Sequence, residues 1–89
     1  MLSELQHAAK VVGVKQVRRA LSDGRAKRLY LAQDADPQLT QPLERQAQEQ
    51  GVETVRVQSM RALGKACGVA VGAAVAATTR SAERPGAGG

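Results

Sequence analysis

The chain has 89 residues and a net charge of +5, which leaves room for one domain with one modest hydrophobic core. Aromatic residues make up only 1% of it, so a platform of aromatic side chains for base stacking, as in RRM and OB-fold proteins, is disfavoured. The charge is uneven, with +5 in residues 1–33, −3 in residues 34–60 and +3 in residues 61–89, and basic thirds that meet in space would attract an anionic partner.

Cysteine content and hydropathy indicate the subcellular compartment of the protein. Its one cysteine, Cys67, has no second thiol for an internal disulfide, which fits a reducing cytoplasm. The longest weakly polar stretch, residues 66–77, is too short to span a bilayer. We therefore expect a cytoplasmic protein that does not associate with a membrane. Because no strong self-association surface is visible in the sequence, we also expect a monomer.

The chain is expected to begin with a helix. Ser3 is a good N-cap residue, and Gln6 stands at capping-box spacing from it, which predicts a helix from residue 4 to residue 11 or 12. Gly13 then ends or redirects this helix.

A second helix and a strand complete the first part of the chain. The helix is predicted over residues 15–22, and Asp23 with Gly24 forms its C-terminal turn. The short apolar run over residues 28–32 fits a buried strand.

The middle of the chain has the pattern of a strand–helix–strand unit. Asp36 is a natural N-cap, with Pro37 at the first helical position. Because Pro42 disfavours a continuous helix, we expect a short turn over residues 37–39 and a new start at Thr40, with the helix ending at residue 50. A strand over residues 52–57 would complete a βαβ unit with parallel strands and a right-handed crossover.

The last part predicts one more helix, a loop and a strand. Ser59 caps a helix over residues 60–67, and an apolar loop between glycines leads to a strand over residues 73–79. Residues 1–79 are therefore expected to form a single α/β domain, a three-layer α/β/α sandwich with a mixed, partly parallel central sheet. Residues 80–89, rich in Gly, Ala, Pro and Arg, are expected to be a disordered tail.

The start of the second helix is the strongest candidate for a binding surface. Lys15 and Gln16 lie four and three residues before Arg19, so the three side chains share one helix face, whereas Val17 lies on another. Gly13 allows a close backbone approach, and the free N–H groups of a helix start suit phosphate or base-edge acceptors. A solvated basic helix face is an equally weighted alternative for these residues alone.

Three motifs, in this order and spacing, resemble the kink-turn-binding ribosomal protein family of the L-seven-Ae type, closest to its short bacterial members. They read GVKQVRR from Gly13, DADP from Asp34 and LGKACGVAVGAA from Leu63, and the resemblance covers residues 3–79. Members of this family recognise the kink-turn, an RNA internal loop with tandem sheared G·A pairs that bends two stems sharply. The resemblance implies an RNA-binding protein whose partner is a structured RNA containing a kink-turn, with the ribosome as one candidate host.

The resemblance places the base contacts in the first motif. Lys15, Gln16 and Arg19 fall at the positions that contact the G·A pairs, and their donors suit guanine O6 and N7. Family members have Gly-Thr-Asn-Glu where this chain has Gly13, Val14, Lys15 and Gln16, so the hydrogen bonds to the two guanines must differ.

Other positions follow from the same resemblance. The loop between glycines matches the segment that closes over a flipped-out nucleotide, Asp36 and Met60 align near that pocket, and Arg18 and Lys65 are candidate phosphate contacts. The complete set of expected RNA-binding residues is Gly13, Val14, Lys15, Gln16, Arg18, Arg19, Asp36, Met60, Lys65, Val69, Ala70 and Val71.

Structural roles compete with some of these assignments. Val69 and Val71 could be plain core residues, Asp36 only an N-cap, and Cys67 an inert buried thiol. No nucleophile elbow, P-loop, dinucleotide fingerprint or metal-ligand cluster occurs, so we expect no enzyme activity, cofactor or metal.

The leading hypothesis is a protein that recognises and stabilises kink-turns in ribosomal or other structured noncoding RNA. One alternative is a ribosome-associated protein-interaction or assembly module of the same fold. The other is a nonspecific RNA binder, whose affinity would depend steeply on salt and not on loop sequence.

Overall fold

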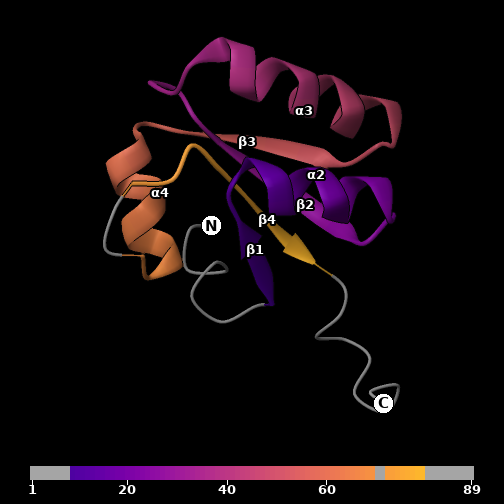
Figure 1. Cartoon of the computed structure of the whole chain (residues 1–89), viewed down its shortest axis with the longest axis horizontal. Coiled ribbons are helices and arrows are strands. Elements are labelled where there is room, and N and C mark those ends of the chain that lie inside the picture. Colours follow the sequence, from indigo (N-terminus) through magenta and orange to yellow (C-terminus); the bar gives the residue numbers. More distant parts are fainter. Residues whose placement is uncertain (1–8, 70–71, 80–89) are drawn as a thin grey trace.

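The computed structural model describes residues 9–69 and 72–79, which form four strands and three helices around one sheet (Figure 1). In chain order these are β1 (Lys10–Val12), α2 (Val14–Ser22), β2 (Ala26–Ala32), α3 (Pro37–Glu49), β3 (Glu53–Val57), α4 (Met60–Cys67) and β4 (Val75–Thr79). The strand order across the sheet is β1-β4-β2-β3. β2 and β3 are parallel, as predicted, and β4 is antiparallel to both of its neighbours, so the sheet is mixed.

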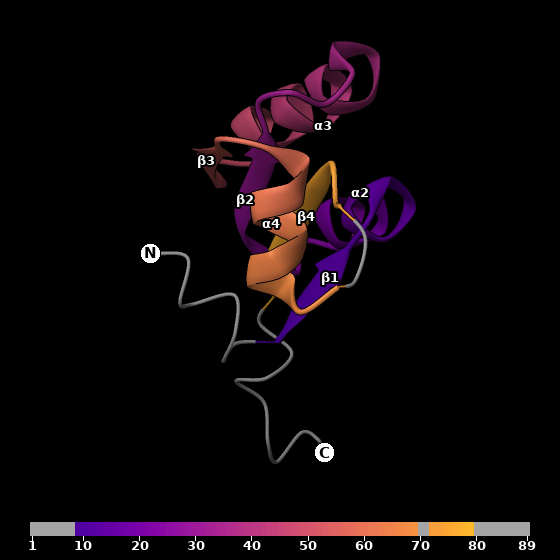
Figure 2. The same cartoon turned by 90° about the vertical axis from the view of Figure 1, so that its left-hand side faces the viewer.

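Helices cover both faces of the sheet (Figures 1 and 2). On one face α2 and α3 pack against the strands through a cluster that includes Val17, Leu21 and Leu43. On the other face α4 packs through Leu63 against a cluster around Tyr30. The sheet is thus the middle of three layers, which confirms the predicted α/β/α fold.

The single aromatic residue of the chain belongs to this core. Tyr30 lies on β2 and its exposed fraction is 0%. Its ring is therefore not available to stack on a base, and contacts to a nucleic acid have to come from aliphatic, polar and charged groups.

The predicted helix over residues 4–12 is wrong at its end, because residues 10–12 form β1. Residues 4–8 of that prediction lie outside the described residues. In β1 Val11 pairs with Ala77 and Val12 with Ala76 of β4. The β-branched valines suit a strand, and their partners lie so far along the chain that no local pattern indicates the pairing.

The new start predicted at Thr40 is also wrong, because α3 runs without a break from Pro37 through Pro42. Asp36 caps this helix by accepting a hydrogen bond from the N–H of Gln38 at 2.9 Å. The proline ring removes the partner of the carbonyl four residues earlier, which is that of Gln38. Both residues are exposed, so water can satisfy this carbonyl and the helix continues.

The other predicted boundaries of helices and strands agree with the structure to within two residues. β2 begins at Ala26 and β4 at Val75, each two residues from the predicted start, and β3 begins at Glu53, one residue later than predicted. The predicted ends of α4 are confirmed, since Ser59 Oγ accepts the N–H of Ala62 at 3.0 Å and Gly68 adopts φ 78°. The tail over residues 80–89 lies outside the described residues, and both it and the extent of the domain stay predictions.

The topology gathers several loops at one edge of the sheet. β1 and β2 are both antiparallel to β4, and β2 is parallel to β3, so the carboxyl ends of β1, β2 and β3 lie at the same edge of the sheet. The helices α2, α3 and α4 all begin there. We call this the carboxyl edge, defined by Gly13 and residues 33–36, 58–60 and 72–74. In open α/β sheets, ligands are commonly bound at such an edge.

Backbone hydrogen bonds tie the loops of the carboxyl edge to the strands. The N–H of Gly13 donates to the carbonyl of Val75 at 3.0 Å, and the N–H of Ala32 donates to that of Ala74 at 2.9 Å. The start of α2 therefore has a fixed position relative to β4 and to the loop that precedes it.

Candidate nucleic-acid interface

Gly13 fixes the geometry at the start of α2. Its φ of 104° and ψ of 152° lie in a region that only glycine occupies readily. Its carbonyl accepts the N–H of Val17 at 2.9 Å, and its own N–H is held by Val75. Glycine offers no side-chain cap, so the first N–H groups of α2 remain available to an acceptor from outside the helix.

The polar face predicted for this helix is on the outside. Val17, Ala20 and Leu21 have exposed fractions of 0%, whereas Lys15, Gln16, Arg18 and Arg19 are exposed. Val14 is half-buried against the core. The amphipathic pattern therefore places Lys15, Gln16 and Arg19 together on the solvent side, and Arg18 flanks them.

The basic side chains of α2 are not neutralised by any other residue that the structure describes. Among residues 9–69 and 72–79, neither Lys15, Arg18 nor Arg19 makes an ion pair. Several acidic residues are engaged with cations elsewhere, in the ion pairs Arg25–Asp23, Arg28–Glu53 and Arg56–Glu44. The face around the start of α2 can therefore present uncompensated positive charge to a polyanion.

The other predicted site residues are only partly brought together. Asp36 caps α3 at the carboxyl edge, and Met60, 36% exposed, begins α4 there. Lys65 is exposed but lies in the last turn of α4, about 7.5 Å along the helix axis from Met60. Val69 is half-buried just after α4. Ala70 and Val71 lie outside the described residues.

Asp34 has a role at this edge that the sequence interpretation missed. Its Oδ1 accepts the N–H of Met60 at 2.7 Å, which joins the loop after β2 to the first residue of α4. The two residues are 26 positions apart. The only local signal is that Asp34 follows a predicted buried strand, at the strand end where side chains of neighbouring loops meet.

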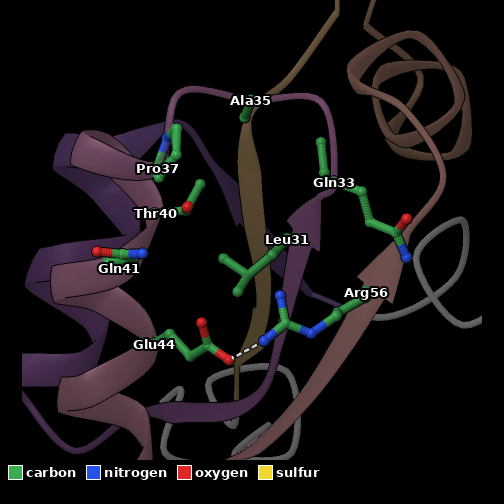
Figure 3. A pocket seen from close by; sticks show the side chains of 9 residues that line it. Leu31, Gln33, Ala35, Pro37, Thr40, Gln41, Glu44 and Arg56 are labelled. Atoms are coloured by element: carbon green, nitrogen blue, oxygen red, sulfur yellow. Dashed lines mark hydrogen bonds and ion pairs between the residues drawn. The ribbon is translucent and has the colours of Figure 1, made fainter.

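A cavity of about 210 Å³ lies on the side of α3 that faces β2 and β3, and Figure 3 shows its lining. Leu31 forms part of its floor, Thr40 lines it from α3, and the Arg56–Glu44 ion pair bridges β3 and α3 beside it. Because these two charges neutralise each other, the cavity offers an anion less attraction than do the cations of α2, which have no ion-pair partner among the described residues.

The described residues include side chains that could ligate a metal ion or act as a nucleophile. No three of their His, Cys, Asp or Glu residues are placed to hold a metal ion. Burial raises the pKa of the Cys67 thiol, although nearby Lys10 acts in the opposite direction, and a raised pKa reduces the nucleophilic thiolate. Within the same residues no helix has both the length and the apolar character needed to cross a membrane.

Comparison with models of known protein families identifies the family of this chain. The model of the ribosomal protein L7Ae/L30e/S12e/Gadd45 family matches residues 2–85, nearly the whole chain. This chain belongs to that family.

Relatives within the L7Ae family carry names that refer to RNA. The chain is 48% identical over 67 residues to "RNA-binding protein" of Bacillus pumilus, a match that covers 75% of this chain and 82% of that protein. It is 42% identical over 76 residues to RNA-binding protein YbxF of Geobacillus stearothermophilus, covering 85% of this chain and 93% of the relative.

Solved structures agree with this membership of the L7Ae family. The 15.5kD RNA binding protein of Giardia lamblia superposes with a TM-score of 0.84 at 28% identity, covering 96% of this chain and 75% of that one. A protein of unknown function from Bacillus halodurans has a TM-score of 0.80 at 22% identity, with coverage of 91% and 85%, and supports the fold alone.

The L7Ae-family match spans the whole candidate interface. All of the expected contact residues, from Gly13 to Val71, fall within residues 2–85. The resemblance read from the motifs is therefore confirmed, while the role of each side chain in binding stays a prediction.

Proposed function

We propose that this protein binds structured RNA at the carboxyl edge and stabilises the kink-turn conformation. The proposal rests mainly on the start of α2 in this member of the L7Ae family. There Lys15, Gln16 and Arg19 are exposed, and the N-cap residue Gly13 provides no side-chain cap for the first N–H groups of the helix. The RNA-related names of the relatives and the positive charge of the chain support the same class of partner.

The side chains of α2 suit the chemistry of guanine edges. Lys15 and Arg19 are donors that can reach O6 and N7, while the amide of Gln16 can both donate and accept. Regular A-form RNA hides these atoms in a deep, narrow major groove, so the helix can reach them only where the duplex is opened by a kink. Arg18 is placed on the flank of the same helix, where it can contact phosphate and position the RNA.

The mechanism that follows is a shift of population. A free kink-turn RNA exchanges between extended and bent forms, and a protein that contacts only the bent form favours it by the difference between its two affinities. No bond is made or broken in this mechanism.

The test compares one kink-turn RNA with a matched RNA in which Watson–Crick pairs replace the G·A pairs. Both are titrated near physiological salt, and energy transfer between dyes on the stem ends reports bending. Tight binding and bending of the first RNA alone is the expected result. Equal and strongly salt-dependent binding to both would contradict the proposal and favour nonspecific binding, and no binding to either would favour an assembly module.

A further inference from the structure

Three loops of the carboxyl edge are joined by consecutive hydrogen bonds through one residue. Asp34 Oδ1 accepts the N–H of Met60 at 2.7 Å, and the carbonyl of Met60 accepts the N–H of Ala73 at 3.0 Å. We call these contacts the Asp34–Met60–Ala73 brace. It links the loop after β2, the start of α4 and the segment that enters β4.

Gly72 extends the brace by close packing. A Cβ atom at this position would lie 3.2 Å from the carbonyl carbon, the carbonyl oxygen and the Cβ of Met60. Two of these atoms belong to the backbone, so they cannot move aside as a flexible side chain would. The segment after α4 therefore rests against Met60, and only glycine permits this approach without displacement.

The brace contributes more than a helix cap. Ser59 already caps α4 by accepting the N–H of Ala62, so the helix start has a local acceptor of its own. Asp34 adds a second acceptor from the loop after β2, and its carboxylate strengthens the hydrogen bond. The distinctive effect of the Asp34 hydrogen bond is to hold the loop after β2 against the start of α4. Both Asp34 and Gly72 are exposed, so neither residue belongs to the hydrophobic core.

We propose that Asp34 is a positioning residue for RNA binding. It holds Met60 in place and, through the carbonyl of Met60, the segment at Gly72 and Ala73, so that these loops receive the RNA in one arrangement beside the start of α2. This inference rests on the proposed function, because it assigns Asp34 to the same interface. Asp34 itself need not touch the RNA, since its carboxylate is engaged with Met60.

The test uses four variants of the full chain. Asp34→Ala removes the acceptor, Asp34→Asn keeps an oxygen that can accept, and Gly72→Ala forces the segment away from Met60. Glu53→Ala is the matched control, because it also removes a carboxylate that accepts a long-range hydrogen bond, that from Arg28 Nε at 3.0 Å, and it lies at the amino end of β3, away from the carboxyl edge. Each variant is measured for its Tm, for affinity to the kink-turn RNA and the Watson–Crick control RNA, and for hydrogen exchange at the Ala73 amide.

We expect Asp34→Ala to weaken binding of the kink-turn RNA about tenfold, since the bond to a charged acceptor is lost. Its affinity for the control RNA should stay unchanged, and exchange at the Ala73 amide should become faster. Asp34→Asn should restore most of the affinity, Gly72→Ala should resemble Asp34→Ala, and Glu53→Ala should bind the kink-turn RNA as the wild-type protein does.

Two results would overturn the inference while leaving the proposed function intact. One is wild-type affinity of Asp34→Ala for the kink-turn RNA. The other is an equal loss of affinity in Glu53→Ala, which would show that the loss of any exposed carboxylate hydrogen bond has the same effect. If the wild-type protein fails to prefer the kink-turn RNA, the proposed function fails, and exchange at the Ala73 amide still tests whether the brace holds the segment.

Discussion

Replacing Gly13 by alanine tests the geometry on which the interface depends. The position has φ 104° and ψ 152°, and an added Cβ would meet no atom within 4 Å. The cost is therefore backbone strain without a steric clash, about 1–3 kcal/mol for a non-glycine residue in this region. The backbone cannot easily relax, because hydrogen bonds to Val75 and from Val17 hold Gly13 on both sides.

This cost should be visible as a change in Tm. One kcal/mol shifts the Tm of a domain of this size by roughly 4–8 °C, so Gly13→Ala should unfold at least about 4 °C lower. Affinity for the kink-turn RNA should fall as well, because the added methyl group obstructs the close approach of the RNA backbone that glycine allows at this position.

Gly51 provides the matched control. It has φ 72°, also meets no atom within 4 Å, and lies in the turn after α3, away from the carboxyl edge. Gly51→Ala should lower the Tm and leave RNA affinity unchanged. Differential scanning calorimetry and RNA titration of both variants give the comparison, and a Gly13→Ala protein with wild-type Tm and affinity would refute the reasoning.

Three further predictions concern charge, helix strain and the thiol. Lys15→Ala and Arg19→Ala should each weaken binding of the kink-turn RNA by about 1–3 kcal/mol if the side chains contact guanine. Parallel titrations should then show a smaller preference over the Watson–Crick control RNA. A uniform loss of affinity for both RNAs, with a smaller dependence of affinity on salt concentration, would indicate phosphate contacts instead. Pro42→Ala should raise the Tm by several degrees in thermal unfolding, because the carbonyl of Gln38 regains a helical partner, and an unchanged or lower Tm would contradict this. The raised pKa of Cys67 means that the folded state disfavours the thiolate form. The contribution of Cys67 to stability is therefore fully present below the pKa of the unfolded thiol, and it is lost as pH rises through the folded pKa. Slow reaction of the folded protein with a thiol reagent near neutral pH checks the direction of the shift.

Local signals predicted most of the fold. The caps at Asp36 and Ser59 mark the starts of α3 and α4 because one side chain satisfies a nearby N–H, an interaction that depends on neighbouring residues only. The parallel pairing of β2 with β3 followed from the strand–helix–strand order. The strand β1 could not be predicted in this way, since its pairing with β4 depends on residues near the other end of the chain.

In the candidate site, too, local features could be predicted from the sequence and long-range contacts could not. The face with Lys15, Gln16 and Arg19 could be predicted because its periodicity is local to α2. Asp34 could not be assigned its partner, since the bond to Met60 exists only after the sheet brings two distant loops together.

The common starting edge of the three helices has an electrostatic consequence. Each helix carries roughly half a positive elementary charge at its N-terminus from its aligned peptide dipoles, and α2, α3 and α4 direct these ends to the same edge. The carboxylate of Asp36 faces the dipole of α3, and that of Asp34 faces the dipole of α4. The dipole of α2 begins at Gly13 and has no carboxylate in its first turn. Acidic residues from the middle of the chain thus offset two of the three dipoles, and a phosphate approaching this edge is drawn toward the remaining one.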